Sequence, residues 1–178
     1  VSNKTDEDIE EVIKAAFMYW IVCEGTFFFS GFAMLLAMSD KIPGITEQIQ
    51  YTLRDETIHI QFGTEVINQL KNQHANVWTT ELQLELIDYV KTAVDLEIQY
   101  AKDVLPTGIL GLNSDMFIDY MQFIANRRLS AVGLPFEYEN ASNPFPWLSE
   151  TIDLSKQKNF FETKVTEYQN AGALADDF

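Results

Sequence analysis

The sequence has few of the residues that disulfide-stabilised, nucleic-acid-binding and membrane-spanning proteins require. Its single cysteine, Cys23, excludes an internal disulfide and fits a reducing compartment. Only 12 Lys and Arg oppose 27 Asp and Glu, and the formal net charge of -15 is expected to repel nucleic acids and anionic lipids. No run approaches the roughly 18 consecutive apolar residues of a membrane span, and the polar first residues lack a signal peptide's apolar region. These absences predict a cytoplasmic protein that binds neither nucleic acid nor membrane.

The residues that are present favour a single helical unit. Hydrophobic residues make up 47% of the 178, including 13 Phe, which is enough for a packed core and excludes global disorder. The chain has no internal repeat, low-complexity tract or interior linker, and it lacks the period-two alternation that is typical of half-buried strands. The sequence therefore predicts an all-α fold with an irregular tail.

Helical periodicity and capping residues predict four helices. Thr5 is the expected cap of the first helix, over roughly 6–39, and Lys-Ile-Pro-Gly at 41–44 then breaks the chain. The second helix is expected over roughly 46–71. Thr79 is a plausible cap for a third helix that ends before Pro106, and Asn113 for a fourth that runs to about Leu129.

Acidic residues interrupt the apolar stripes of the first two predicted helices. Glu24 stands on one stripe, and Glu56 and His59, three residues apart and therefore one helical turn apart, stand on the other. An unpaired buried carboxylate costs several kcal/mol, so it needs a cation or a proton. Ferritin-like di-iron proteins use a lone Glu on each of two helices and Glu-x-x-His on each of two others. This chain shows half of that ligand set.

Other residues of reactive type have simpler interpretations. Glu-x-x-His by itself is a weak signal and usually lies on a solvated helix face; its place on an apolar stripe, with a second Glu one helix earlier, favours a metal site. His74 lies in a polar connection and is expected in an exposed loop. The run 27–29, three Phe residues, is expected to pack in the core. Cys23 is expected to be a buried, inert thiol.

Several longer motifs occur along essentially the whole chain. They are Cys-Glu-Gly-Thr-Phe-Phe-Phe-Ser-Gly-Phe at 23–32, Pro-Gly-Ile-Thr-Glu-Gln-Ile-Gln-Tyr at 43–51, Leu-Arg-Asp-Glu-Thr-Ile-His at 53–59, Leu-Pro-Thr-Gly-Ile-Leu-Gly-Leu-Asn at 105–113, Ala-Asn-Arg-Arg-Leu at 125–129, Asn-Pro-Phe-Pro-Trp-Leu at 143–148 and Asn-Phe-Phe-Glu-Thr-Lys-Val-Thr-Glu-Tyr at 159–168. In this order they resemble one family, the small, radical-generating subunit of class I ribonucleotide reductase.

The resemblance implies a role for each matching residue. Glu24, Glu56 and His59 match metal ligands of the family's second half, with Glu56 as the bridging ligand. Asp55 matches an acid that links a ligand histidine to a tryptophan on the radical path. The apolar pocket around the radical site is matched by Phe28 and Phe32. Tyr168 matches the tail tyrosine that relays the radical to the catalytic large subunit, and Glu162 matches the acid that supports this transfer. The end of the chain at Phe178 resembles the peptide that docks on the large subunit.

The chain also departs from the family pattern. It begins about halfway along a full-length small subunit, so the first-half Asp, the first Glu-x-x-His, the radical tyrosine and the path tryptophan have no counterpart. Thr52 stands where the family usually has an aliphatic residue. We therefore expect the second half of a ferritin-like bundle over residues 1–158 and a flexible docking tail over 159–178, mobile from Tyr168 onward in the free protein.

The expected function is that of the C-terminal half of a split ribonucleoside-diphosphate reductase small subunit. It would share a dinuclear centre (Fe/Fe, Mn/Fe or Mn/Mn) with an N-terminal half, dimerise as assembled small subunits and engage the large subunit through its tail. Two alternatives remain open at this stage. The chain is a metal-free scaffold, or it is a homodimeric di-iron protein in which two copies complete the ligand set.

Overall fold

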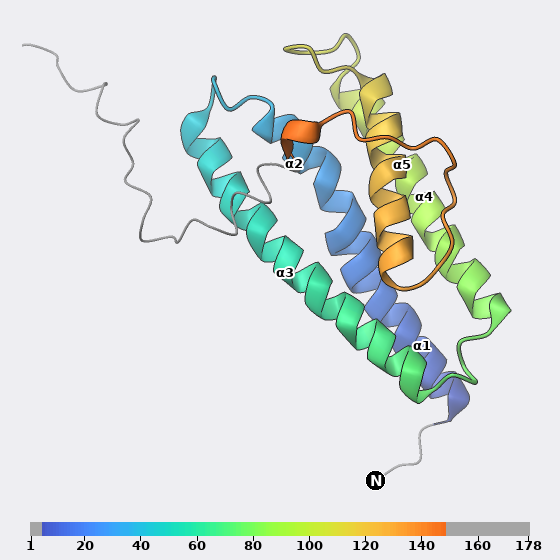
Figure 1. Ribbon diagram of the computed structural model, residues 1–178. Helices are drawn as coiled ribbons and strands as arrows, with labels where there is room; N and C mark the ends of the chain where they lie inside the picture. The colour runs from blue at the N-terminus through green and yellow to red at the C-terminus, as the bar shows by residue number, and fades with distance from the viewer. Residues whose placement is uncertain (1–4, 149–178) are drawn as a thin grey trace, which may run out of the picture.

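The computed structural model describes residues 5–148, which form an all-helical bundle (Figure 1). Its elements are α1 (Asp6–Phe17), a π-helical segment η1 (Met18–Phe27), α2 (Phe28–Leu36), α3 (Pro43–Gln73), α4 (Thr80–Val104) and α5 (Ser114–Ala131). Within this range the only β pairing is an isolated bridge between Ile109 and Leu112. The predicted all-α fold class is confirmed.

The three predicted helix caps are confirmed. Thr5 forms a capping box, in which its hydroxyl accepts a hydrogen bond from the Asp8 N–H (3.2 Å) and the Asp8 carboxylate accepts one from the Thr5 N–H (2.8 Å). The side chains of Thr79 and Asn113 each accept from the backbone N–H three residues later, at 3.2 and 3.1 Å. Each cap satisfies an N–H group that has no partner inside its helix.

Two predicted boundaries are corrected by the structure. The first helical stretch ends at Leu36 rather than at about residue 39. The break predicted at 41–44 is shorter, because Pro43 is the first residue of α3 rather than part of the loop. Proline is compatible with this position, since the N–H that it lacks would have no helical partner there. Thr46, the predicted start, lies inside the helix and donates from its hydroxyl to the Pro43 carbonyl at 3.0 Å.

The element η1 occupies the centre of the bundle. Together with α1 and α2 it forms one long helical stretch, which has α3 on one side and α4 with α5 on the other (Figure 1). The segment after α5 folds back over α5. There the ring centroid of Phe145 lies 5.2 Å from that of Phe117 and 5.0 Å from that of Tyr120. All three side chains are buried. Residues from every helix therefore contribute to a common core.

The long helical stretch Asp6–Leu36 is also the one candidate for a membrane span among the described residues. It passes by length and composition, and half of its most apolar window is buried in the bundle. Core helices of soluble proteins pass the same test, so this is weak evidence for a span. Its packing against α3, α4 and α5 accounts for its apolar composition.

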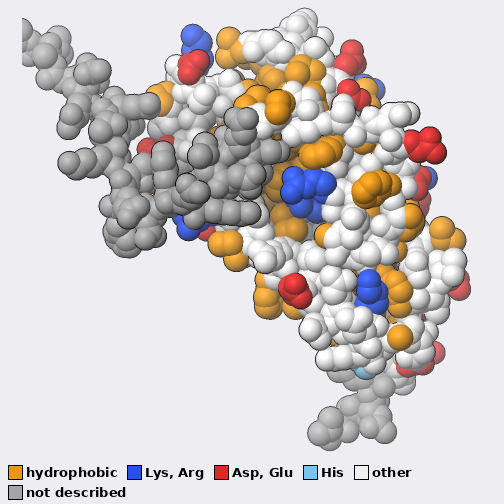
Figure 2. All heavy atoms as spheres, viewed as in Figure 1, with side chains coloured by type: hydrophobic (Ala, Val, Ile, Leu, Met, Phe, Trp, Pro, Cys, Tyr) orange, Lys and Arg blue, Asp and Glu red, His pale blue; other side chains and the backbone are white. Residues whose placement is uncertain are grey.

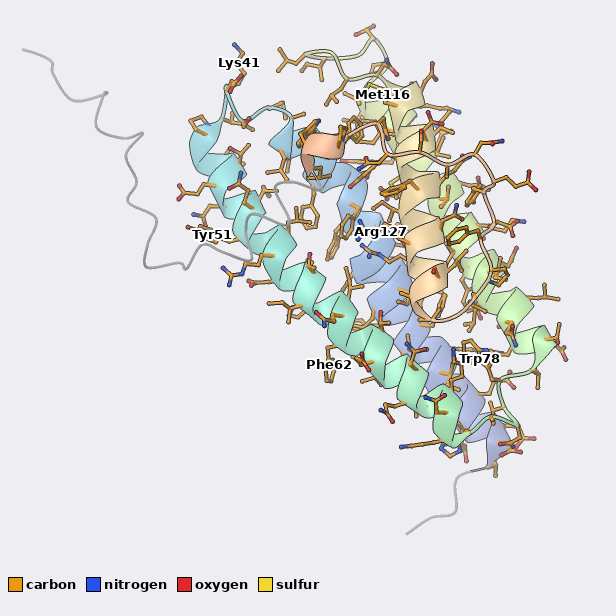
Figure 3. All side chains as sticks on the ribbon, in the orientation of Figure 1. Lys41, Tyr51, Phe62, Trp78, Met116 and Arg127 are labelled. Carbon is orange, nitrogen blue, oxygen red and sulfur yellow. The ribbon has the colours of Figure 1, made fainter. Side chains whose placement is uncertain are left out.

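Large apolar side chains remain exposed on several helices. They include Tyr19 of η1, Ile58 and Phe62 of α3, and Leu96 of α4. Figure 2 shows hydrophobic side chains scattered over the face in view. Figure 3 labels Phe62 on α3, where its ring lies 5.7 Å from that of Trp20. Tyr19, Ile58 and Phe62 lie on η1 and α3, the two elements that pack against each other.

Candidate metal centre

Glu24 belongs to a π-helical segment, which the sequence analysis did not predict. The long helix predicted over roughly 6–39 is helical from Asp6 to Leu36, but residues 18–27 have π-helical rather than α-helical geometry. The side chain of Thr26 donates to the carbonyl of Ile21 at 2.9 Å, and Nε of Arg128 in α5 donates to the carbonyl of Gly25 at 2.8 Å. A π-helical turn accommodates one extra residue per turn, and such turns occur often at functional sites.

The structure brings together the three residues that the stripes and the resemblance selected. Ligand atoms of Glu24, Glu56 and His59 all lie within 4.8 Å of one another. Nδ1 of His59 is 3.4 Å from Oε2 of Glu56 and 3.9 Å from Oε2 of Glu24. Glu24 is only 7% exposed, whereas the His59 side chain is 54% exposed. The cluster is therefore buried on one side and open on the other.

Two oxygens in this cluster have no hydrogen-bond partner. Oε2 of Glu24 and Oε2 of Glu56 are both buried and unpaired. Burial raises the pKa of Glu56, the negative charge of Glu24 raises it further, and His59 opposes both effects. Two buried carboxylates of like charge, each with one oxygen that has no hydrogen-bond partner, are unfavourable without a bound cation. A bound cation would both coordinate the unpaired oxygens and offset the repulsion between the two carboxylates.

The donor set fits a transition metal. Carboxylate oxygen and imidazole nitrogen bind iron and manganese alike, so the residues present do not select between them. Three side chains from two helices leave most positions of a dinuclear site for other ligands. These residues therefore fit half of a dinuclear carboxylate site, with His59 and Glu56 on one rigid helix and Glu24 opposite.

Comparison with known proteins assigns the chain to a family. Residues 1–144 match the family model described as ribonucleotide reductase, small chain. The chain belongs to the ribonucleotide reductase small-chain family. It is 55% identical over 176 residues to the ribonucleoside-diphosphate reductase subunit beta of Chlamydia pneumoniae, a match that covers 98% of this chain and 51% of that protein. The ribonucleoside-diphosphate reductase small chain of Schizosaccharomyces pombe is 34% identical over 172 residues. That match covers 96% of this chain and 41% of the Schizosaccharomyces pombe protein.

A solved structure agrees with the family. The ribonucleotide reductase R2 subunit from Clostridium botulinum superposes with a TM-score of 0.77 at 28% identity, covering 82% of this chain and 47% of that one. The predicted ferritin-like small-subunit fold is thus confirmed. The 178-residue chain spans about half the length of the relatives that it matches.

Phe28 and Phe32 both line one cavity of about 460 Å³. Thr52 lines it as well, and its hydroxyl donates to the Gln48 carbonyl at 3.2 Å. The hydroxyl therefore has a partner within its own helix. The expectation that all of 27–29 would pack in the core is wrong, because Phe28 is 44% exposed and only Phe29 is fully buried.

Two polar residues near the site were missed by the sequence analysis. Glu97 of α4 is buried, lines the same cavity and accepts a hydrogen bond from the Ser30 hydroxyl. Burial raises the pKa of Glu97, and the Ser30 hydrogen bond partly opposes this. Its position four residues from both Ala93 and Ala101, on an apolar stripe, was the available signal. Tyr19 was also missed; hydrogen bonding to Glu24, five residues later, raises the pKa of its phenol.

The remaining predicted residues lie apart from the cluster or outside the described range. Asp55 is exposed on α3, one residue before Glu56. His74 is partly buried rather than exposed; it is the C-cap of α3, and its backbone N–H donates to the Leu70 carbonyl at 2.9 Å. Cys23 is likewise only partly buried. Tyr168, Glu162 and the predicted boundary at residue 158 lie outside the described residues.

Proposed function

We propose that this chain acts as the C-terminal half of a ribonucleoside-diphosphate reductase small subunit. The observation that carries the proposal is the cluster of Glu24, Glu56 and His59, with its two unpaired buried oxygens, in a chain of this family. Glu24, Glu56 and His59 would hold one side of a dinuclear iron or manganese centre. A second polypeptide carrying Asp and Glu-x-x-His would supply the other side. A cytoplasmic location suits this role.

The protein's own contribution is to position ligands and exclude water. Bound metal ions would supply the oxidising equivalent that starts nucleotide reduction. The α3 backbone fixes Glu56 and His59 one turn apart, and η1 presents Glu24 from the opposite side. Phe28 and Phe32 would limit access of water from the adjacent cavity. Asp55 would orient a ligand through a hydrogen bond, as outer partners of metal ligands commonly do.

The large subunit would be engaged through the tail. In this proposal Tyr168 carries the oxidising equivalent across the subunit interface, Glu162 supports the accompanying proton movement, and the last residues through Phe178 provide the docking contact. Assembled small subunits would pair as a dimer. The apolar side chains exposed on η1 and α3 support a covering polypeptide on the metal side.

The tail roles are separated by two variants in the reconstituted enzyme. Tyr168→Phe should keep affinity for the large subunit, because only a hydroxyl is lost, and should stop turnover, because phenylalanine is far harder to oxidise. Removal of the last residues should weaken binding and spare the metal centre. Nucleotide reduction and large-subunit affinity are measured for both. Normal turnover of Tyr168→Phe would exclude the relay role.

A further inference from the structure

The carbonyl that follows the ligand Glu24 has a partner from another helix. Nε of Arg128, near the end of α5, donates to the Gly25 carbonyl at 2.8 Å. The guanidinium also lies over the ring of Phe29, 4.6 Å from its centroid. Burial lowers the pKa of Arg128 to about 10, so it remains a charged donor at neutral pH. A charged donor makes a stronger hydrogen bond than a neutral one.

The residue at position 25 has to be small for this contact. A Cβ on Gly25 would lie 2.8 Å from the Trp20 carbonyl oxygen and 3.1 Å from Nε of Arg128. Both distances are closer than an ordinary van der Waals contact. Glycine at this position therefore lets the π-helical backbone and the arginine approach each other.

A hydrogen bond from the Thr26 side chain stabilises the same turn of η1. The fully buried Thr26 donates from its hydroxyl to the Ile21 carbonyl at 2.9 Å, across the five-residue spacing of a π-turn. Glu24 lies between these two residues. The helical turn that presents the ligand is thus held locally by Thr26 and from outside by Arg128.

We infer that Arg128 is a positioning residue, whose hydrogen bond to Gly25 holds the π-helical turn and thereby keeps Glu24 opposite Glu56 and His59. The predicted effect on metal binding rests on the proposed function. The role in holding the π-helical turn rests only on the contacts of this chain. Arg128 itself is not among the residues of the ligand cluster.

The chain offers a matched control at the adjacent position. Arg127 is exposed on α5, where its guanidinium lies 5.7 Å from the Phe123 ring centroid, and Figure 3 labels it. The test compares Arg128→Met, Arg128→Lys and Arg127→Met with the wild type in the full chain. Amide hydrogen exchange is measured over residues 21–27, and NMR contacts are measured between the Glu24 side chain and the His59 ring. Co(II) is then titrated, with and without a polypeptide that supplies the missing ligands.

Arg128→Met should speed amide exchange over residues 21–27 by about 10-fold or more and weaken the contact between Glu24 and His59. Co(II) affinity should fall roughly 10- to 100-fold, the usual effect of losing a residue that orients a ligand. Arg128→Lys keeps the charge without the planar fork, so it should show smaller effects in the same direction. Arg127→Met should match the wild type.

Exchange and NMR contacts that are the same in Arg128→Met and Arg127→Met would overturn the inference. If Arg128→Met does not fold, wild-type behaviour of Arg128→Lys in exchange, contacts and Co(II) spectrum would overturn it equally. Absence of Co(II) binding by the wild type, even with the second polypeptide, would instead defeat the proposed function. In that case the exchange and contact measurements still decide the role of Arg128.

Discussion

Removal of one charge from the cluster of Glu24, Glu56 and His59 should stabilise the metal-free chain. Glu56→Gln eliminates the repulsion between two buried carboxylates and introduces an amide N–H group beside Oε2 of Glu24, which has no hydrogen-bond partner. A buried polar group without a partner costs about 1–3 kcal/mol. The free energy of unfolding of the metal-free variant should therefore exceed that of the wild type by about 1–3 kcal/mol. For a chain of this size each kcal/mol corresponds to roughly 2–4 °C in melting temperature.

The same substitution should have the opposite effect once metal is present. A metal ion that binds only the folded state adds to the stability of that state, and the variant lacks one of the side chains proposed to coordinate the metal. Unfolding is followed by circular dichroism for the chain alone in chelator, and for its assembly with the second polypeptide in Mn(II). Glu65→Gln, an exposed change on the same helix, is the control and should shift stability by less than about 0.5 kcal/mol. A metal-free Glu56→Gln that is less stable than the wild type would refute the reasoning about unpaired charge.

Three further substitutions test separate features of the structure. Gly63→Ala places a methyl group against the Trp20 side chain and should destabilise the fold by about 1–3 kcal/mol in urea unfolding; unchanged stability would show that the ring moves freely. Glu97→Gln should gain stability relative to the wild type as pH rises above 4.5, the ordinary pKa of a glutamate. Burial raises the pKa of folded Glu97, so the wild type loses stability as pH rises from the unfolded pKa to the folded one, and a pH-independent difference would contradict this. Asp55→Ala should lower metal affinity by roughly 10- to 100-fold, and complete loss of binding in a metal titration would make Asp55 a ligand instead.

The sequence was sufficient for those parts of the fold that depend on local chemistry. Thr5, Thr79 and Asn113 mark three helix starts because each side chain bonds a backbone N–H within its own first turn. The proximity of Glu24, Glu56 and His59 was also predictable. Acids on apolar stripes must be buried, and two such stripes that pack together bring them close.

The π-helical segment depends on contacts that the local sequence does not contain. Arg128 reaches Gly25 from more than one hundred residues away, and no periodicity in 18–27 indicates that partner. The exposure of Phe28 and His59 has a similar origin. An apolar stripe indicates which helix face is favourable to bury, but it does not indicate whether the element that buries it lies within the described residues.

Metal content tests the central claim most directly. The chain, assembled with a polypeptide that carries Asp and Glu-x-x-His, is purified as wild type and as the double variant Glu56→Ala with His59→Ala, and bound iron and manganese are determined by elemental analysis. We predict a dinuclear complement in the wild-type assembly and its loss in the double variant. Equal metal content in the two proteins would contradict the assignment of Glu24, Glu56 and His59 as half of a dinuclear site.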